Sequence, residues 1–506
     1  MKAMSNKTIP IIDLFAGPGG LGEGFMRLRK SNKRVFNIAL SIEKDPQAHK
    51  TLMLRSIFRK FDDGKAPSCY YEYISGKITK DEFLKNSLIK DCAKEALNEA
   101  KNVALGEIAS SQVDTWISQR IQRNKKWVLI GGPPCQAYSL AGRSKMINLD
   151  KDKYEADHRH LLYKEYLRII EKHSPPIFIM ENVKGILSSK FNNQLIFNQI
   201  LSDLKNPKKG LEYEIRSLVV EGSNEELLPS DYIIKSELFG IPQARHRVIL
   251  FGVRKDLAKK KHHTLKKTSK LTVGQALSGL PEIRSKLSKE HDSHENWIKC
   301  LGRTQTLLSG LNQKDKSIIQ DVLKHNLDLA NFCTSTGSEF ISGNFYKHMQ
   351  QSEFKTWIQD SRLLGISHHT ARGHIQSDIQ RYFFLSSHVE AFGHQPKVTD
   401  LPKKLLPSHK NIHSKNTPFT DRFRVQNSSE NSTTIVSHIS KDGHYYIHPS
   451  PWQARSLTVR EAARLQTFPD NYFFEGTRTE QYTQVGNAVP PMLAYKIAEI
   501  VSDFLQ

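Results

Sequence analysis

One cysteine of the chain lies in a loop whose residue types suit a nucleophile. Cys135 is part of GGPPCQAYS, residues 131–139, which follows the apolar run WVLI at 127–130. The two prolines fix the backbone and remove two amide donors, and the two glycines let the chain turn and a substrate approach closely. A free cysteine is also among the most buried residue types, so a structural cysteine in a tight turn is the competing interpretation. The other motifs of the chain decide between them.

A glycine-rich turn near the start of the chain is typical of a nucleotide-binding site. Residues 13–22, DLFAGPGGLG, contain G-x-G-x-x-G between a predicted strand and a predicted helix, and Glu43 ends the next predicted strand. The backbone at Gly17 and Gly19 can approach a ligand closely, the helix N-terminus favours a negative group, and an acid at that place can bind ribose hydroxyls. NAD and S-adenosylmethionine fit this turn equally well, and a purely structural turn is the remaining interpretation.

Further polar groups follow other predicted strands. Glu181 and Asn182 come directly after IFIM at 177–180, which places them at the carboxyl end of a strand, where open α/β sheets bind ligands. Arg245 and Arg247 in QARHR share one face if that segment is extended, and this face can bind a base or a phosphate, although a solvated edge strand would show the same pattern.

Two C-terminal segments complete the set of motifs. QVGNAVPP at 484–491 is a Gly/Pro loop before the last predicted helix, and we expect it to complete the pocket. Residues 459–466 predict a helix that packs on the sheet through Ala and Leu, with Arg460 and Arg464 outside.

The elements that carry these motifs alternate along the first half of the chain. Short apolar runs alternate with helical periodicity, which predicts an α/β fold with a mostly parallel sheet. We expect strands at 9–15, 35–42, 127–130, 177–180 and 247–253, and helices at 21–30 and 161–173.

Beyond about residue 255 the composition changes. A basic stretch at 259–267 marks a candidate domain boundary, and the segment to about 450 is rich in Ser, His, Asn and Lys. Lys441-Asp442-Gly443 predicts a hairpin between 435–439 and 445–448. Because the motifs resume at Arg455, this second domain is expected to be inserted into the first.

Composition limits the class of protein. The chain has 506 residues, which predicts two domains, and 74 Lys and Arg against 52 Asp and Glu give a formal net charge of +22. That charge favours nucleic acid as the partner over a generally basic surface. No apolar stretch reaches the roughly 18 to 20 residues of a membrane span, so we expect a cytoplasmic, nucleoid-associated protein with no membrane contact. Five cysteines without a C-x-x-C pair argue against disulfides and a zinc ribbon, and we expect no metal.

Together these motifs resemble those of the DNA (cytosine-5) methyltransferase family. DLFAGPGG resembles the family's first motif, GGPPCQAYS its catalytic loop, ENVKG its acid motif and QARHR its Gln-x-Arg-x-Arg motif, while RSLTVREAARLQTFPD and QVGNAVPP resemble its final pair. The resemblance covers 1–255 and 451–506. It implies a Rossmann-like, S-adenosylmethionine-dependent catalytic domain formed by these two segments, with a helical insertion at about 58–101. Residues 256–450 would then be a smaller, mixed α+β target-recognition domain.

The resemblance implies methyl transfer to carbon 5 of a cytosine flipped out of duplex DNA. Cys135 would attack carbon 6 while Glu181, in its acid form, donates to ring N3. Arg247 would bind the cytosine carbonyl and Arg245 would brace the loop or the thiolate, although the assignment between the two arginines stays open.

The resemblance also implies a site for S-adenosylmethionine, whose product is S-adenosylhomocysteine. Phe15 would pack on adenine or methionine, and Glu43 would bind the ribose hydroxyls. Glu107-Ile108 stands where the family usually has Asp-Ile, and Lys44 stands where an aromatic residue is common. The full expected cofactor set is Phe15, Gly17, Gly19, Glu43, Glu107, Ile108, Pro134, Leu162, Asn487 and Val489.

Other functions remain open at this point. A tRNA cytosine-5 methyltransferase would use the same chemistry, a catalytically silent DNA-binding module would keep the fold, and a nicotinamide oxidoreductase would use only the glycine turn. Residues 372–378 and 421–424 are candidate base readers, with phosphate contact or salt bridging as the alternative. The expected partners are double-stranded DNA and a cognate restriction endonuclease or other defence proteins, and the expected oligomeric state is a monomer.

Overall fold

The computed structural model describes residues 8–62, 64–122, 124–134, 158–191, 194–222, 226–407 and 422–505, and these form two compact units. The first unit consists of Met1–Ala66, Leu84–Lys270 and Ala488–Gln506, and the second of Pro67–Phe83 and Leu271–Asn487. Residues 67–83 and 451–487 therefore pack with the second unit, although the sequence groups them with the catalytic segments. Which function each unit performs stays a prediction.

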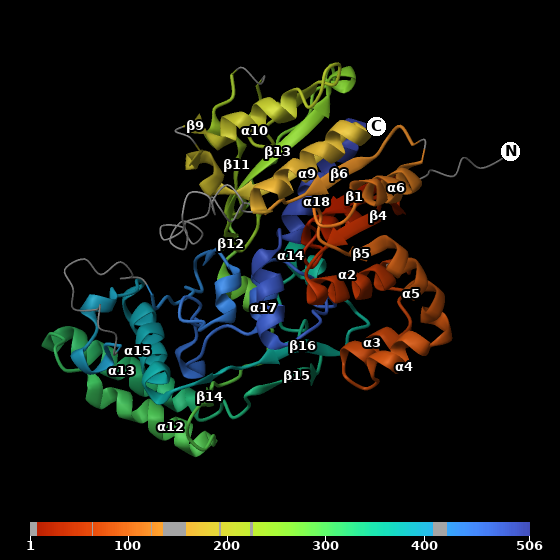
Figure 1. The fold of residues 1–506 in the computed structure, drawn as a ribbon. Helices are drawn as coiled ribbons and strands as arrows, with labels where there is room; N and C mark the ends of the chain where they lie inside the picture. The colour runs from red at the N-terminus through yellow and green to blue at the C-terminus, as the bar shows by residue number, and fades with distance from the viewer. Residues whose placement is uncertain are drawn as a thin grey trace. The chain divides into compact units, whose positions relative to one another are not determined.

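The first unit is built on a mostly parallel sheet, as the sequence predicts. Its strands lie in the order β10-β13-β7-β6-β1-β4-β5, and β11 pairs with β13 (Figure 1). The neighbouring pairs from β7 to β5 are parallel, whereas β13 is antiparallel to β7, β10 and β11. The strands are β1 (Ile9–Leu14), β4 (Phe36–Glu43), β5 (Ala100–Asn102), β6 (Val128–Gly131), β7 (Ile177–Val183), β10 (Tyr213–Arg216), β11 (Ile233–Lys235) and β13 (His246–Arg254).

Helices cover both faces of this sheet. They are α1 (Gly20–Arg27), α2 (Pro46–Arg59), α5 (Ser87–Glu99), α6 (Ser110–Ile121), α9 (His158–His173), α10 (Ile196–Lys205) and α18 (Pro491–Leu505). Local sequence explains several of their ends. Asp45 caps α2 by accepting from the amides of Gln47 and Ala48, with Pro46 in the first turn, and Asn86 caps α5.

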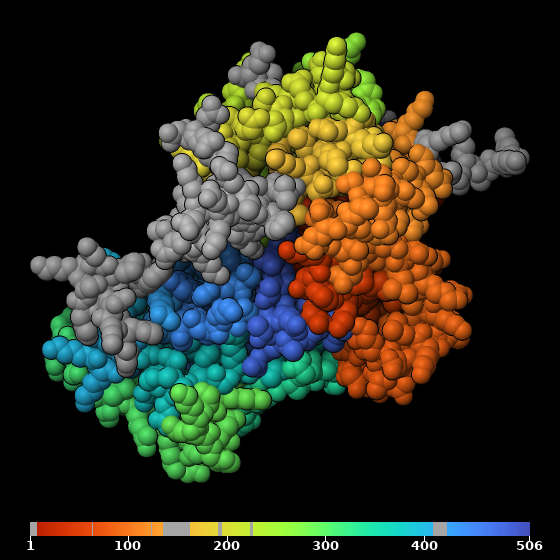
Figure 2. All heavy atoms as spheres, in the orientation of Figure 1, coloured from red at the N-terminus to blue at the C-terminus, as the bar shows by residue number. Residues whose placement is uncertain are grey.

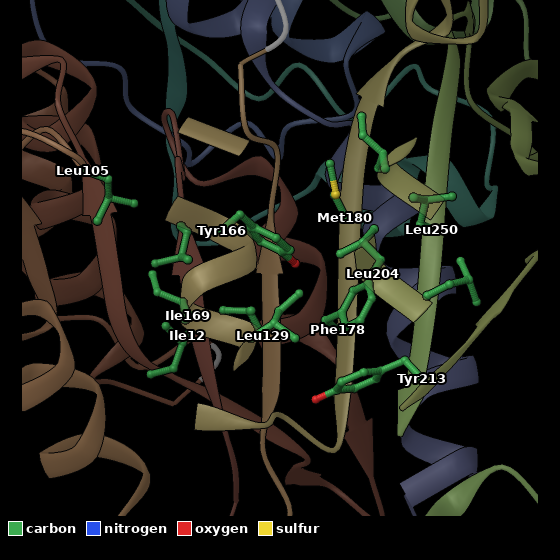
Figure 3. Packing of buried hydrophobic residues seen from close by; sticks show 14 of the residues in the cluster. Ile12, Leu105, Leu129, Tyr166, Ile169, Phe178, Met180, Leu204, Tyr213 and Leu250 are labelled. Atoms are coloured by element: carbon green, nitrogen blue, oxygen red, sulfur yellow. The ribbon is translucent and has the colours of Figure 1, made fainter. Parts of the chain in front are cut away.

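The core of the first unit lies between the sheet and helices α6, α9 and α10. Tyr166 and Ile169 of α9 pack over Ile12 and Leu129, as Figure 3 shows. The alternation of side chains along a strand explains why only every second strand residue joins this cluster. On the opposite face, the ring of Phe251 in β13 lies 5.8 Å from that of Phe504 in α18.

The second unit has its own core and mixes helices with short two-stranded ladders. A buried hydrophobic cluster of this unit includes Trp297, Ile319, Tyr382 and Phe383. On the face of the molecule that Figure 2 shows, side chains cover the backbone of the described residues. No helix of the described residues is both long and apolar enough to cross a bilayer. The longer elements are α11 (Val273–Leu277), α12 (His294–Arg303), α13 (Gln313–Ala330), β15 (Gly337–Ser342), α14 (Glu353–Ile358), β16 (Gly365–Thr370), α15 (Gln376–Phe392), α16 (Val459–Leu465) and α17 (Arg478–Asn487).

The prediction that Arg460 and Arg464 of α16 face the solvent is wrong. Arg460 and Arg464 are both 0% exposed. The Arg464 guanidinium donates to both carboxylate oxygens of Asp470, at 3.0 and 2.7 Å, and Arg460 donates to the carbonyls of Ser367 and Tyr472. Amphipathic periodicity could not reveal this, because a buried charge is tolerated where partners elsewhere in the chain satisfy it.

The hairpin predicted around Gly443 is also wrong. Ser437–Ser440 forms a 3-10 turn, and Ile447 bridges to Val425 and Ser456 instead of pairing with residues 435–439. The backbone of Val436 and Ser437 packs against Gly486, where an added Cβ would be 2.3 Å from each. Residues 436 and 437 therefore contact α17 instead of forming a strand of the predicted hairpin.

Two further segments, residues 484–491 and 58–101, can be compared with the sequence predictions. The first half of QVGNAVPP is helical, because α17 continues through Asn487 before α18 begins at Pro491. Residues 58–101 hold the end of α2 with α3 (Ser68–Ile74), α4 (Lys80–Lys85) and α5. Within the second unit, the hydroxyls of Tyr71 and Tyr73 donate to the carboxylates of Asp360 and Glu475.

The close contact between α1 and α18 predicts that a substitution at Gly24 destabilises the protein. A Cβ on Gly24 would lie 2.4 Å from the Pro491 carbonyl oxygen and 2.4 Å from the Tyr495 amide nitrogen. Both are backbone atoms, so Gly24→Ala must displace α18, and we expect the free energy of unfolding to fall by about 1–3 kcal/mol in chemical denaturation. The control Gly302→Ala, whose Cβ meets only Leu327 at 3.8 Å, should unfold like the wild type or later. Equal denaturation midpoints for the two variants would contradict the packing.

Candidate functional site

The parallel strands bring the predicted chemical groups to one edge of the sheet. β1 pairs in parallel with β4 and β6, and β6 pairs in parallel with β7. The carboxyl ends of these strands therefore lie side by side, and they lead to Phe15, Glu43, Gly132 and Glu181. Because β13 runs antiparallel to β7, its amino end, with Arg247 opposite Val183, lies at the same edge.

The glycine turn after β1 has the geometry of a ligand cradle. Phe15 and Gly17 both have φ of +56°, and Gly19 has φ of +93°, so the turn folds tightly before α1. A Cβ on Gly17 would meet no atom within 4 Å, which leaves open space above it. Glu43 fixes the turn: its carboxylate accepts from the amides of Gly17 and Asp45, each at 2.8 Å. Burial raises the pKa of Glu43, while these amide hydrogen bonds lower it.

Asp13 lies at the start of this turn, beside Gly22, and has no predicted role. It is 2% exposed, and a Cβ on Gly22 would be 2.9 Å from its carboxylate oxygen, which explains the glycine there. Burial raises the pKa of Asp13 to about 8, the Arg59 guanidinium opposes that shift, and Glu43 adds to it. The signal that could have found it is an acid inside an otherwise apolar strand.

Glu181 and Arg247 form an ion pair at the sheet edge. Arg247 Nε lies 2.9 Å from Glu181 Oε1, and both side chains are largely buried. Burial lowers the pKa of Arg247, and the neighbouring Glu181 carboxylate opposes this shift. The pair fixes an acid and a planar donor beside each other, so a planar polar ligand could contact both.

The loop that leads to Cys135 lies against this pair. A Cβ on Gly132 would be 2.9 Å from Glu181 Oε2, so a glycine at this position leaves room for the Glu181 carboxylate where it lies. Asn182 Nδ2 donates to the Pro133 carbonyl at 3.3 Å and ties the loop to β7. Pro134, a predicted cofactor residue, is partly exposed at the end of the described loop. Cys135 itself lies outside the described residues.

The segment before Arg247 is held by contacts that the sequence did not reveal. Arg245 is 2% exposed, and its amide donates to the Ser236 hydroxyl at 3.0 Å. The same hydroxyl donates to the Gln243 carbonyl at 2.6 Å. His246, between the two arginines, lies 2.8 Å from Glu237 Oε1. Ser236 and Glu237 were missed because nothing local marks a residue that acts through a tertiary contact.

The remaining predicted cofactor residues occupy several places. Glu107 is exposed and Ile108 packs against the core, both in a turn closed by the Ala104 carbonyl after β5. Leu162 is partly exposed on α9. Val489 is buried in the first unit, whereas Asn487 is exposed at the end of α17 in the second unit. The structure does not test their roles.

The candidate base readers are mainly structural where they are described. Arg372 is 9% exposed, lies 4.3 Å over the Tyr482 ring and donates to the Ile439 carbonyl. Arg422 lies 3.8 Å from Asp442, and Asp421 lies outside the described residues. These contacts favour the salt-bridging alternative for Arg422 and a packing role for Arg372, and whether either reads a base stays a prediction. Within the described ranges, no group of three or more His, Cys, Asp or Glu side chains could hold a metal ion.

Comparisons with known proteins agree on one family. Residues 79–503 match the sequence model of the C-5 cytosine-specific DNA methylases. A type II methyltransferase of Bacillus paralicheniformis is 34% identical over 98% of this chain and 99% of its own. A DNA (cytosine-5-)-methyltransferase of Aeropyrum pernix is 26% identical over 75% of this chain and 81% of its own.

A solved structure shares the fold. An E. coli prophage protein described as a DNA modification methyltransferase superposes with a TM-score of 0.57 at 19% identity, covering 98% of this chain and 99% of its own.

The buried Asp13 predicts a pH-dependent stability. Its pKa of about 8 in the folded state lies above the value of 3.8 for an unfolded carboxyl group, so the folded protein retains a proton that the unfolded chain releases. The stability contributed by the neutral form is fully present below about pH 4 and is lost as the pH rises through 8. In urea denaturation we expect the wild type to lose stability relative to Asp13→Asn between pH 5 and pH 8.

Asp62→Asn is the matched control for this series. Its side chain is 75% exposed beside Lys65, so its removal should leave the pH profile of the wild type unchanged. Parallel profiles for Asp13→Asn and the wild type would show that Asp13 ionises normally in the folded protein.

Proposed function

Because the chain belongs to the C-5 cytosine-specific DNA methylase family, we propose that it transfers a methyl group from S-adenosylmethionine to carbon 5 of a cytosine in double-stranded DNA. The observation that carries this proposal is the position of Glu181. It lies 2.9 Å from Arg247 and against Gly132 of the loop that leads to Cys135. An acid, a donor and the approach to a thiol thus meet at the edge where α/β sheets bind ligands.

Cytosine carbon 5 is a weak nucleophile inside an aromatic ring, so the proposed reaction begins by breaking that aromaticity. The Cys135 thiolate forms a bond to carbon 6 while Glu181, which must first take up a proton, donates it from its acid form to ring N3. The resulting enamine places electron density on carbon 5, which would take the methyl group from the sulfonium and leave S-adenosylhomocysteine. A base then removes the carbon 5 proton, the thiolate leaves as the double bond returns, and ring N3 gives its proton back to the Glu181 carboxylate. Arg247 would hold the cytosine carbonyl beside Glu181.

The glycine turn suits the proposed methyl donor, which supplies an electrophilic methyl group when bound. The open space above Gly17, the positive φ values of the turn and the fixed carboxylate of Glu43 form a cradle for a nucleoside at the amino end of α1. Phe15 and Ile108 offer apolar surface at the same edge. The residues therefore fit S-adenosylmethionine, with Glu43 oriented by Gly17 and Asp45 to accept from the ribose hydroxyls.

The target base must leave the duplex before this chemistry can occur. Flipping a base costs a few kcal/mol, and protein contacts to the DNA backbone must offset that cost. The formal net charge of +22 suits this requirement, because each cation that neutralises a phosphate releases a counterion.

The biological setting of the proposed activity follows from the relatives. The Bacillus protein is a type II methyltransferase, so we propose that this chain modifies DNA beside a restriction endonuclease or another defence system. Bisulfite sequencing of a host that expresses the protein would reveal the modified sequence. Methylated tRNA in place of methylated DNA would favour the alternative substrate.

The proposed mechanism predicts the effects of two substitutions on methyl transfer. Cys135→Ser removes the nucleophile, so incorporation of labelled methyl groups into duplex DNA should fall to background. Glu181→Gln keeps the size of the side chain but cannot donate an acidic proton, so kcat should fall by about 10²- to 10⁴-fold. Cys92→Ser, which changes a partly exposed cysteine of α5, should retain full activity. Normal methylation by Cys135→Ser would exclude the covalent mechanism.

The cofactor assignment predicts a loss of affinity in Glu43→Gln. The variant loses the charge and one of the two acceptors that now bind Gly17 and Asp45. A charged hydrogen bond contributes about 1.5–3 kcal/mol, so the Kd for S-adenosylmethionine should rise about 10- to 100-fold in calorimetry. Glu95→Gln, whose side chain is 68% exposed on α5, should bind the cofactor like the wild type. Unchanged affinity in Glu43→Gln would place the ribose elsewhere.

A further inference from the structure

Four lysines of the first unit gather at the sheet edge that carries Glu181 and Arg247. Lys184 directly follows β7, and Lys235 ends β11, where it pairs with His246. Lys266 and Lys267 lie between Leu265 and Thr268, whose amides each donate to a backbone carbonyl. All four side chains are exposed. We call these residues, Lys184, Lys235, Lys266 and Lys267, the basic margin.

Backbone contacts fix the course of the chain that carries Lys266 and Lys267. After β13 ends at the opposite edge, the Leu265 amide donates to the Leu218 carbonyl beyond the end of β10. The Thr268 amide donates to the Leu238 carbonyl at 3.0 Å. Leu238 belongs to the turn Ser236–Phe239, whose Ser236 holds the Arg245 amide. The segment therefore returns along the sheet to the arginine loop, and the buried side chain of Leu265 anchors it.

The charge of the basic margin is not neutralised within the described residues. None of its four ammonium groups forms an ion pair or a hydrogen bond with any described residue. Of the nearby carboxylates, Glu181 pairs with Arg247 and Glu237 Oε1 lies 2.8 Å from His246 Nε2, and neither forms a described ion pair with the basic margin. Four positive charges that have no acidic partner in the described part of the chain thus lie around this edge, in positions set by two strands and an anchored segment.

We propose that the basic margin binds the phosphate backbone of the DNA duplex beside the flipped cytosine. This inference rests on the proposed function and adds to it a surface of which only Lys184 belongs to one of the motifs. Lysine is suited to the task because it acts as a point charge and needs no fixed geometry. Contacts of this kind fix the duplex against the site without reading sequence, and their contribution decreases as salt increases.

The test compares two matched variants with the wild type. The margin variant carries Lys184→Gln, Lys235→Gln, Lys266→Gln and Lys267→Gln. The control variant carries Lys125→Gln, Lys126→Gln, Lys209→Gln and Lys259→Gln. The control lysines are also exposed and likewise unpaired among the described residues, but they lie near the start of β6, near the start of β10 and after the end of β13, at the opposite edge. Both variants lose the same charge.

The measured quantity is the affinity for a duplex that contains the modified sequence, determined across a range of salt concentrations. Each phosphate contact contributes about 0.9 to the slope of log affinity against log salt, so the margin variant should lose up to about 3.6 of this slope. At low salt its Kd should rise at least about 10-fold, and the control variant should match the wild type. A third variant with Arg at the four margin positions should keep the slope of the wild type.

The outcomes separate this inference from the proposed function. Equal slopes and equal affinities for the margin and control variants would overturn the inference, even if the wild type methylates DNA. Failure of the wild type to bind or methylate duplex DNA would instead overturn the proposed function. Binding of S-adenosylmethionine, measured for every variant, shows whether the first unit remains folded. If the margin variant loses this binding and the Arg variant keeps it, a role limited to phosphate contact is contradicted.

Discussion

The pairing of β7 with β6 on one side and β13 on the other determines the rest of the site. Parallel pairing with β6 aligns Glu181 with the loop that follows Gly131, and antiparallel pairing with β13 brings Arg247 to the same level. A shift of one residue in either register would turn the acid or the arginine to the other face of the sheet. Close approach at Gly132 and the Asn182 hydrogen bond to Pro133 then hold the described start of the loop against β7.

Much of this arrangement could be predicted from sequence, because apolar strands followed by polar residues leave a local signal. The strands that carry Glu43, Glu181 and Arg247 were all found by their apolar runs, and the motifs identified the family. The supporting contacts could not be found this way. Ser236 holds Arg245, and Asp13 lies beside Gly22, because in each case the chain folds back on itself within nine residues, and a pattern of apolar residues carries no signal of such a contact.

The second unit shows the limit of sequence patterns more clearly. Arg460 and Arg464 look like the solvent face of a short helix, yet both are fully buried against carbonyls and Asp470. Gly443 indicates a hairpin, yet the neighbouring backbone packs on Gly486 of α17. In both cases, the deciding partner comes from another part of the chain, and local periodicity carries no information about it.

Each unit is assembled from separate stretches of the chain, so the two units cannot be separated by a single cut in the sequence. The first unit is assembled from three stretches, and the second takes Pro67–Phe83 from within them as well as Leu271–Asn487. Within the second unit, Tyr71 and Tyr73 of the short stretch bind Asp360 and Glu475 of the long one. An exchange of the second unit between relatives by recombination would therefore have to transfer both stretches together, because a single crossover pair would leave these tyrosines and acids with mismatched partners.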